Sequence, residues 1–403
     1  MTHSEASYGD LFISCGEISG DGYAAAVTRS LKERGYCGRI YGMAGPQSRS
    51  AGVEILWDSR LLHLMGIVEV MPSIPRLFRL KREMVDTVLR TRPATVLVID
   101  SPDFHLRFIE SLRSRGWRGR VVYAVPPTVW AWRAWRVRSL ARNADLCLPL
   151  FRFEDDFLRE HGVSSAWRGH PLVDEFAKVE LRRPSPPDGG NRRIALFPGS
   201  RGSEIRRLLP PLKECAALLK KDGFSPVFSI APGLPEDLRG WMRNELHGEE
   251  IFEGDGRELL ASSTAAAGAS GTVAVEAMMT GRFFVVLYKV GILSLLVWKL
   301  LGKTRLISLP NILAGEIVYP ELLQKEATGK KAFSALRRFL FEREYQTRVE
   351  RGISEARKAM GEEGASDFWA GLVLSSLSIS CARHERVQDS KEKQVNGQKE
   401  ARS

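Results

Sequence analysis

Two carboxylates follow an apolar run near residue 100. The segment VLVIDSPDFHLR places Asp100 and Asp103 after the run Thr95 to Ile99. A carboxylate whose pKa is raised by burial can accept a hydroxyl proton near neutrality, so this segment suits general-base catalysis. Two other interpretations stay open: Asp103 could cap a helix that starts at Phe104, and His105 could be the base or an ordinary helix residue.

A turn of small residues follows another apolar run, Ile194 to Phe197. The sequence FPGSRGSEI forms the turn from Pro198, Gly199 and Ser200, and Arg201 stands at the expected start of a helix. Backbone amides, a helix N-terminus and a guanidinium group can together bind a diphosphate. The turn lacks the GK[ST] motif of nucleotide-triphosphate loops, so ATP hydrolysis is not indicated.

A second loop of the same half offers the complementary part of a nucleotide site. In AGASGTVAVEAMMTG, Ser270, Gly271 and Thr272 precede a helix that carries Glu276. An acidic residue in this position can accept hydrogen bonds from ribose hydroxyls, although Glu276 alone could be a solvated helix residue. Together the two loops predict a nucleoside-diphosphate site in which Arg201 and helix dipoles stabilise the leaving diphosphate. No DxD or histidine cluster supplies metal ligands, so neither a metal nor a cofactor is expected.

A glycine-rich segment, GEISGDGYAAA, follows the apolar run Leu11 to Ser14. Gly16, Gly20 and Gly22 would let backbone amides approach a ligand, and the N-terminus of the following helix favours an anion. The spacing is not G-x-G-x-x-G, so a nicotinamide-dinucleotide site is poorly supported. A purely structural turn remains an alternative.

Short apolar runs alternate with amphipathic segments along the chain, which predicts parallel sheets covered on both faces. Ligands bind at the loops that follow the carboxyl ends of such strands, so the four loops above are the expected sites of chemistry. The predicted strands are Leu11 to Ser14, Thr95 to Ile99, Val121 to Val125, Leu146 to Leu150, Ile194 to Phe197, Val227 to Ile230, Thr264 to Ala267 and Phe283 to Tyr288.

The alternation restarts after RRPSPPDGGNRR, a segment rich in proline, glycine and charge. We therefore expect an α/β protein with two doubly wound domains, and a cleft between two such domains is a natural ligand site. The expected ranges are an N-terminal domain at 1–181, a linker at 182–193, a C-terminal domain at 194–345, helices at 346–382 and a disordered tail at 383–403. The helices predicted near the C-terminus are Ala332 to Met360 and Phe368 to Leu377.

The composition is that of a globular protein with anionic partners. The 403 residues are 44% hydrophobic and 27% charged, with a net charge of +11. These values exclude a disulfide-stapled miniprotein and a disordered chain. The positive charge favours phosphorylated ligands, an acidic membrane surface or nucleic acid. No RNA-recognition, helix-turn-helix or zinc-finger pattern is present, so no nucleic-acid partner is expected.

Cysteine usage and the termini indicate a cytosolic protein. Five cysteines lie far apart without a CxxC motif, which predicts buried reduced thiols, and the first residues lack the features of a secretory signal. The segment Phe283 to Leu301 approaches the length of a membrane span, but Lys289 and Gly291 interrupt it. We predict a buried strand at Phe283 to Tyr288 and a short apolar helix at Leu293 to Leu301.

Tryptophan and arginine alternate in VVYAVPPTVWAWRAWRVRSLARNAD. Tryptophan favours the bilayer interface and arginine pairs with phosphate headgroups, so this segment and Leu61 to Arg82 could hold an amphipathic substrate at a membrane. The alternative is partly core packing and partly stacking of tryptophan on arginine. The membrane-facing candidates are Trp130, Trp132, Arg133, Trp135 and Arg136.

Taken together and in order, the motifs resemble those of the lipid-A-disaccharide synthase family. They are GEISGD, MGIVEV, IDSPDFH, PPTVWAWR, GHPLVDEF, FPGSRGSEI, ASGTVAVEA, SLPNILAGE and PELLQ, and they extend from Leu11 to Ala327. The resemblance implies a GT-B inverting glycosyltransferase with two Rossmann-like domains and C-terminal helices that pack back toward the N-terminal domain. It implies a UDP-2,3-diacylglucosamine donor, a 2,3-diacylglucosamine 1-phosphate acceptor, and a β-1,6-linked disaccharide 1-phosphate plus UDP as products.

The resemblance also implies roles for individual residues. Asp103 becomes the candidate base, Arg201 a diphosphate ligand, Glu276 a ribose ligand and Asn311 a donor-side residue required for activity. Phosphate contacts are implied for Gly199, Ser200, Ser270, Gly271 and Thr272, and acceptor-side roles for Glu17, Ser19, Gly20 and Asp21. Members of the family are peripheral proteins on the cytoplasmic face of the inner membrane, and dimers occur among them, so a homodimer is one expectation.

Two other functions stay open at this point. A UDP-sugar epimerase could use the same architecture, and it would have a polar mouth in place of an apolar rim. A noncatalytic protein that binds anionic lipids would leave Asp103, Arg201 and Glu276 without a joint purpose.

Overall fold

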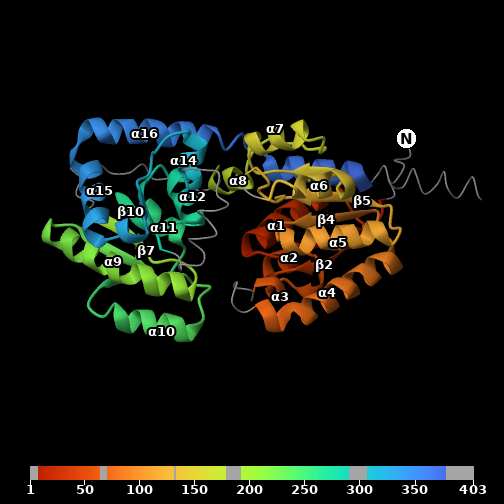
Figure 1. Cartoon of the computed structure of the whole chain (residues 1–403), viewed down its shortest axis with the longest axis horizontal. Helices are drawn as coiled ribbons and strands as arrows, with labels where there is room; N and C mark the ends of the chain where they lie inside the picture. Colours follow the sequence, from red (N-terminus) through yellow and green to blue (C-terminus); the bar gives the residue numbers. More distant parts are fainter. Residues whose placement is uncertain (1–7, 64–69, 131–132, 178–191, 290–305, 378–403) are drawn as a thin grey trace, which may run out of the picture. The chain divides into compact units, whose positions relative to one another are not determined.

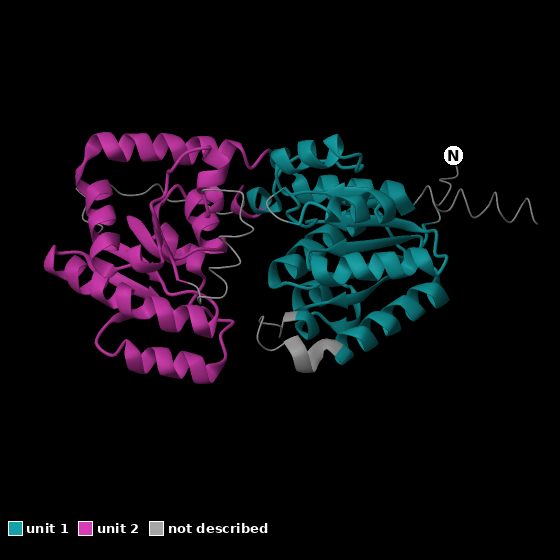
Figure 2. Cartoon of the chain, in the orientation of Figure 1, with its two compact units in different colours: residues 1–174, 362–403 teal, residues 175–361 magenta. Residues whose placement is uncertain are grey.

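The computed structural model describes residues 8–63, 70–130, 133–177, 192–289 and 306–377. The chain forms two compact units, which Figure 2 colours teal and magenta: unit 1 contains residues 1–174 and 362–403, and unit 2 contains residues 175–361. The predicted C-terminal segment 346–382 is divided between the units, because its first part packs in unit 2. The predicted tail, Trp132, the helix Leu293 to Leu301 and most of the linker lie outside the described residues.

Unit 1 is built on a six-stranded sheet in the order β3-β2-β1-β4-β5-β6. All of its strand pairs are parallel. The order is that of a doubly wound dinucleotide-binding sheet, in which β1 and β4 meet where the winding direction reverses. The strands are β1 (Leu11–Cys15), β2 (Ile40–Ala44), β3 (Glu54–Asp58), β4 (Thr95–Ile99), β5 (Arg120–Ala124) and β6 (Leu146–Leu148).

Alternate residues of the central strands enter two separate cores. Phe12, Val96 and Val98 belong to one cluster, and Ile13 and Leu97 belong to the other. Because neighbouring side chains of a strand point to opposite faces, both faces of the sheet are covered (Figure 1). The helices are α1 (Ile18–Glu33), α2 (Pro46–Ala51), α3 (Arg60–His63), α4 (Val70–Thr91), α5 (Pro102–Ser114), α6 (Arg136–Asn143), α7 (Arg152–Glu160) and α8 (Pro171–Ala177).

A helix at residues 365–377 completes the core of unit 1. Trp369 is buried and lies edge-to-face with Tyr23 of α1, with ring centroids 6.0 Å apart. Asp367 accepts hydrogen bonds from Ser30 and Arg34 of α1. The C-terminal helix therefore packs on the N-terminal part of the chain, as the resemblance implied.

Unit 2 repeats the architecture with a second six-stranded parallel sheet, in the order β12-β11-β10-β7-β8-β9. Here β7 and β10 are the neighbours at the reversal point. The strands are β7 (Arg193–Phe197), β8 (Ser225–Ser229), β9 (Glu250–Phe252), β10 (Ala265–Ala269), β11 (Phe283–Tyr288) and β12 (Glu321–Leu323).

The helical region near the C-terminus is broken where a single helix, Ala332 to Met360, was predicted. Glu342 has an extended backbone, with φ −100° and ψ 98°, and it separates α15 from α16. The break lets the buried residues Leu336 of α15 and Ile353 of α16 pack separately. The helices of unit 2 are α9 (Gly202–Lys221), α10 (Glu236–Glu245), α11 (Gly256–Ala261), α12 (Thr272–Met279), α14 (Leu309–Ala314), α15 (Gly329–Phe341) and α16 (Arg343–Lys358), with a 3-10 turn at Gln324–Glu326.

The eight predicted strands all occur, with ends shifted by at most two residues. The prediction missed β2, β3, β9 and β12; β9 and β12 have only three residues each and are only partly buried. Phe283–Tyr288 is a strand, buried except at its last residue, as predicted. Among the described residues, no helix is long and apolar enough to cross a bilayer. Cys15, Cys147 and Cys215 are free and buried as predicted, but Cys37 is exposed.

Candidate functional site

Each sheet brings two of the predicted loops together at its reversal point. In unit 1, Cys15 at the end of β1 is paired with Ile99 at the end of β4. In unit 2, Phe197 at the end of β7 is paired with Gly268 in β10. Ligands of open parallel sheets bind at this position, so both pairs of loops lie where a ligand is expected.

Asp100 connects the two loops of unit 1. Its carboxylate accepts hydrogen bonds from the backbone N–H groups of Gly16, at 2.9 Å, and Glu17, at 3.1 Å. A Cβ atom on Gly20 would lie 1.8 Å from Asp100 Oδ2, so glycine is required there. Gly20 therefore makes room for this carboxylate, whereas the sequence suggested that the glycines of the loop make room for a ligand.

The carboxyl group of Asp100 is tuned by its surroundings. Burial raises the pKa of Asp100 to about 7, although the amides of Gly16 and Glu17 oppose the shift. Its backbone has φ +57°, and Ser101 follows with φ +43°, a rare pair of left-handed residues that turns the chain sharply at the end of β4. Asp100 thus has the burial-raised pKa that the sequence argument required of a general base.

Asp103, the predicted base, lies in the first turn of α5 and pairs with arginines. The helix α5 begins at Pro102, so the prediction that Asp103 caps a helix starting at Phe104 is wrong. The side chain of Asp103 is 69% exposed and forms ion pairs with Arg133, at 3.0 Å, and with Arg136. Two guanidinium groups therefore pair with the same oxygen, Oδ1, of the Asp103 carboxylate.

His105 is fully buried, and both of its ring nitrogens have partners. One nitrogen, Nε2, lies 2.7 Å from Ser14 Oγ, and the other, Nδ1, lies 2.8 Å from the backbone oxygen of Asp100. Burial lowers the pKa of His105 to about 4, so the ring is neutral near pH 7. This environment supports a positioning role at the end of β4 rather than proton transfer with a substrate.

The first loop separates exposed residues from structural ones. Glu17 and Ser19 are exposed, whereas Gly20 and Asp21 are buried. The Asp21 carboxylate accepts hydrogen bonds from the N–H groups of Gly45, Gln47 and Ser48 at the start of α2. Both of its oxygens accept hydrogen bonds, so Asp21 holds α2 in place, and Glu17 and Ser19 are the exposed members of the predicted acceptor-side set.

The turn after β7 presents a backbone amide to a negatively charged oxygen. The N–H of Ser200 donates to Oε2 of Glu204, at 3.2 Å, and Gly199 adopts φ +122°, which favours glycine. Burial is the main reason why the pKa of Glu204 is raised. Arg201 is exposed at the N-cap of α9. A phosphate oxygen could accept a hydrogen bond from the Ser200 amide as the Glu204 carboxylate does. The sequence analysis did not single out Glu204.

The loop after β10 leaves the start of α12 accessible. Gly271 and Thr272 are exposed and Ser270 is half-buried, and nothing lies within 4 Å of the position that a Cβ of Gly271 would take. Glu276 lies one turn into α12, with its side chain 17% exposed, and Oε1 accepts a hydrogen bond from Arg257 Nε at 3.1 Å. Burial raises the pKa of Glu276, and Arg257 opposes that effect.

Asn311 is a structural residue of its loop. It is fully buried in α14, its Nδ2 donates to Glu321 and to the backbone oxygen of Tyr319, and its Oδ1 accepts from the N–H groups of Val318 and Tyr319. Glu321 also accepts from the N–H of Ser308. All four hydrogen-bonding positions of its side-chain amide are used within the protein, so Asn311 holds the loop that the prediction placed on the donor side.

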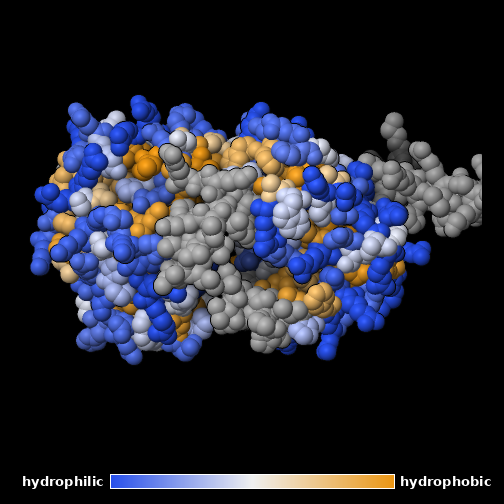
Figure 3. All heavy atoms as spheres, viewed as in Figure 1, coloured by the Kyte–Doolittle hydropathy of each residue, from blue (hydrophilic) through white to orange (hydrophobic). Residues whose placement is uncertain are grey.

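The predicted membrane-facing residues have divided roles. Trp135 is 67% exposed, but Trp130 donates its Nε1 hydrogen to Glu154 at 3.0 Å, and Arg133 and Arg136 pair with Asp103. Phe78 of α4 is also exposed. Figure 3 shows hydrophilic residues over most of the described part of the visible face, with apolar residues in smaller groups between them.

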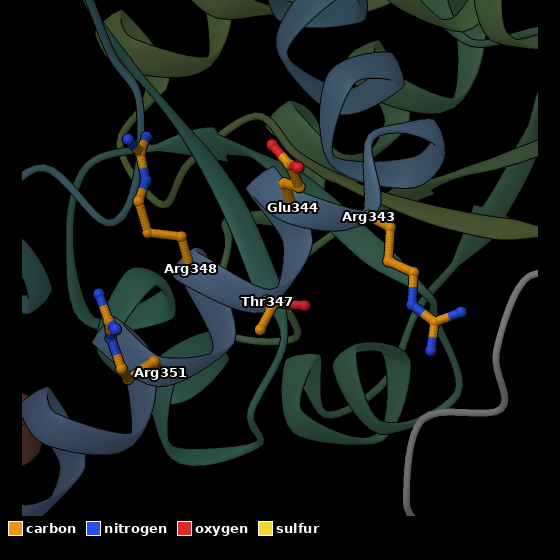
Figure 4. Close-up of a pocket in the computed structure, with 5 residues that line it drawn as sticks. All are labelled: Arg343, Glu344, Thr347, Arg348 and Arg351. Atoms are coloured by element: carbon orange, nitrogen blue, oxygen red, sulfur yellow. The ribbon is translucent and has the colours of Figure 1, made fainter.

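A separate hollow of about 530 Å³ lies along α16 (Figure 4). Arg343, Glu344, Thr347, Arg348 and Arg351 line it. Arg343 and Arg348 extend to opposite sides of the helix, so their guanidinium groups do not converge. None of the loops that follow a strand contributes to this hollow, which is therefore not the candidate site.

Comparison with known proteins identifies the family. Residues 11–367 match the model of the lipid-A-disaccharide synthetase family. The chain is 35% identical over 380 residues to a lipid-A-disaccharide synthase of Myxococcus xanthus, an alignment that covers 91% of this chain and 97% of that protein.

Solved structures with the same fold include sugar-nucleotide enzymes. One is a UDP-GlcNAc 2-epimerase from Neisseria meningitidis bound to UDP-GlcNAc, with a TM-score of 0.60 and 12% identity over 91% of this chain and 100% of that chain. Another is the calicheamicin glycosyltransferase CalG4, with a TM-score of 0.55 and 15% identity over 92% and 98% of the two chains. The fold is GT-B, as the resemblance implied, and the match over almost all of the chain decides the family. The chain belongs to the lipid-A-disaccharide synthase family, glycosyltransferases of lipid A biosynthesis.

Proposed function

We propose that the protein transfers 2,3-diacylglucosamine from UDP to the 6-hydroxyl of 2,3-diacylglucosamine 1-phosphate, with inversion at the anomeric carbon. The products are the β-1,6-linked disaccharide 1-phosphate and UDP. The observation that supports this proposal most is the meeting of the loops after β7 and β10 at the reversal point of the second sheet.

The donor diphosphate is assigned to these two loops. Gly199 and Ser200 offer the turn after β7, and Ser270, Gly271 and Thr272 offer the start of α12. The guanidinium of Arg201 can reach phosphate oxygens from the N-cap of α9. Arg201 and the backbone amides at the start of α12 would neutralise the charge that develops as UDP leaves.

The ribose is assigned to Glu276. Among the described residues, only one oxygen of its carboxylate, Oε1, has a hydrogen-bond partner. The other oxygen can accept a hydrogen bond from a ribose hydroxyl.

On the acceptor side, Asp103 keeps the role of base that the resemblance implied, and Asp100 is proposed as a second candidate. The pKa of about 7, which burial causes, allows the carboxylate of Asp100 to accept a proton near neutrality. The exposed charge of Asp103 is already shared by Arg133 and Arg136. In the proposed step, one of these two carboxylates takes the proton of the 6-hydroxyl while the hydroxyl oxygen attacks the anomeric carbon and the bond to UDP breaks. Glu17 and Ser19, exposed at the start of the segment that follows β1, are proposed to orient the acceptor.

The protein is proposed to act as a peripheral protein on the cytoplasmic face of the inner membrane, because both proposed substrates carry acyl chains. Trp135 and Phe78 are the exposed aromatic residues that support contact with a bilayer. A homodimer is part of the same proposal.

The decisive experiment measures UDP release from UDP-2,3-diacylglucosamine with and without the acylated sugar phosphate. Release that requires the acceptor, together with formation of the disaccharide, supports the proposal. Interconversion of the UDP-sugar without an acceptor would instead indicate an epimerase. Binding of lipid without turnover of either kind would indicate a noncatalytic protein.

A further inference from the structure

Arg257 lies at the centre of an ion-pair cluster that no sequence motif singled out. It is the second residue of α11, and its Nε donates to Glu276 Oε1 at 3.1 Å. Its Nη2 lies 2.7 Å from Glu175 Oε2, and its guanidinium carbon lies 5.0 Å from the ring centroid of Phe176. Three elements, α8, α11 and α12, therefore meet at one guanidinium group.

We propose that Arg257 is a positioning residue of the nucleotide site, which keeps the Glu276 carboxylate ionised and oriented for the ribose while Glu175 and Phe176 hold Arg257. This inference rests on the proposed function, because it assumes that Glu276 binds the ribose. The guanidinium occupies one oxygen of Glu276 and leaves the other, among the described residues, without a hydrogen-bond partner.

The surroundings of Glu276 explain why a cation is needed there. The side chain is largely buried, and burial favours the neutral acid. Asp255 and Glu175 face it with negative charge, which raises its pKa further, and Arg257 is the cation that opposes both effects. A neutral carboxylic acid is a weaker hydrogen-bond acceptor than a carboxylate, so its protonation would weaken ribose binding.

Arg257 is itself held from several sides. Its backbone N–H donates to the Asp255 carboxylate at 2.9 Å, which fixes the start of α11. Glu175 and the buried ring of Phe176 hold the far side of the guanidinium. An arginine held in this way loses little freedom when it binds Glu276, which suits a positioning role.

The test compares UDP affinity in the full-length protein, measured by calorimetry from pH 5.5 to 8.5. The variants are Arg257→Gln, Glu276→Gln and the double variant. Arg338→Gln is the matched control, because Arg338, like Arg257, forms an ion pair with a glutamate, Glu342, at 2.9 Å, and lies over an aromatic ring, at 4.2 Å. Circular dichroism melts check that every variant folds.

We expect Arg257→Gln to weaken UDP binding about tenfold at pH 7, the size of one charged hydrogen bond. The loss should grow as the pH falls and shrink toward pH 8.5, because Glu276 without its cation ionises only at higher pH. In the Glu276→Gln background, Arg257→Gln should cause no further loss. Arg338→Gln should bind UDP like the wild type.

Two outcomes would overturn the proposal in different ways. If Glu276→Gln weakens UDP binding but Arg257→Gln does not, or if the two losses add, Arg257 does not act through Glu276 and the ribose assignment survives. If Glu276→Gln leaves UDP affinity unchanged, the ribose assignment fails and this inference fails with it. Should Arg257→Gln not fold, Arg257→Lys removes the planar guanidinium group that contacts both Glu276 and Glu175, and a UDP affinity in that variant equal to that of the wild type at pH 6 would equally refute the proposal.

Discussion

The carboxylate of Asp100 accepts a hydrogen bond from the backbone N–H of Gly16 across a distance of 2.9 Å. This contact joins the loop after β4 to the loop after β1. These are the two loops at the reversal point of the first sheet. It places an acid with a pKa near 7 beside the exposed side chain of Glu17. The relationship makes Asp100 the second carboxylate of the IDSPDFH motif that should be tested beside Asp103.

If Asp100 is the base, Asp100→Asn should lower kcat by about a hundredfold or more, because a positioned general base contributes about 10²–10⁴ in rate. UDP affinity should stay within about twofold, since Asp100 belongs to unit 1 and the proposed nucleotide site to unit 2. Turnover is measured as acceptor-dependent UDP release. In that case Asp103→Asn, the matched control, should retain most of kcat; the opposite order of the two variants would confirm Asp103 as the base.

If Asp100 is the base, the pH dependence of kcat/KM should show an acid limb. Burial raises the pKa of Asp100 to about 7, so the carboxyl becomes protonated and inactive as the pH falls below this value. The rate should then fall about tenfold per pH unit in the acid range. In the residual activity of Asp100→Asn this limb should be absent, and a limb that persists unchanged would assign the titration to another group.

Arg201→Gln should weaken UDP binding by about ten- to a hundredfold, because a charged hydrogen bond to phosphate is lost. Binding of uridine, which lacks phosphates, should be unaffected. Calorimetry measures both ligands. Arg206 is the matched control, since it lies further along α9 with its guanidinium 4.3 Å from the ring centroid of Trp241. An equal loss for uridine and UDP would mean that Arg201 does not contact the diphosphate.

His105 should make the folded state less stable in acid. Burial lowers its pKa to about 4 in the folded protein, whereas an unfolded histidine has a pKa near 6.5. As the pH falls, the unfolded chain therefore binds the proton before the folded protein does. The contribution of neutral His105 to the free energy of unfolding is complete above about pH 6.5. It is lost as the pH falls toward about 4, by up to ~1.4 kcal/mol per pH unit.

The variant His105→Gln isolates this effect, because glutamine keeps hydrogen-bonding groups and does not titrate. His170, whose pKa burial lowers to about 3, remains and provides its own acid dependence. Urea unfolding at pH 7.5, 6 and 5 should therefore give a pH slope that is smaller by about one proton in the variant. Equal slopes in both proteins would show that folding does not lower the pKa of His105.

Trp135→Ser and Phe78→Ser together should move the protein from anionic vesicles to the supernatant in a flotation assay. Both side chains are exposed, and exposed aromatic rings favour the interface of a bilayer. Ile317→Ser is the control, because Ile317 is an apolar residue of unit 2 with 62% exposure. An unchanged distribution of the double variant would exclude these two residues from the membrane contact.

Much of the fold could be predicted from local patterns. Buried parallel strands such as Thr95–Ile99 and Phe283–Tyr288 are continuous apolar runs, and the loops after them stand out by their glycine, proline and charge. Strands such as Glu250–Phe252 escaped prediction because three residues, none of them fully buried, leave no long apolar run. The helix break at Glu342 also escaped it, because periodicity alone does not report where a helix turns back onto its sheet.

The alternation of apolar runs and helices predicts doubly wound sheets. Any doubly wound sheet brings loops that are distant in sequence together at its reversal point. The sequence by itself therefore determined the family, the two sheets and the four loops where chemistry is expected. Only the tertiary structure decided which side chains those loops leave free. Hydrogen-bond partners occupy the side chains of Asp21, His105 and Asn311. Burial raises the pKa of Asp100, and the fold places Arg257 of α11 against Glu276 of α12.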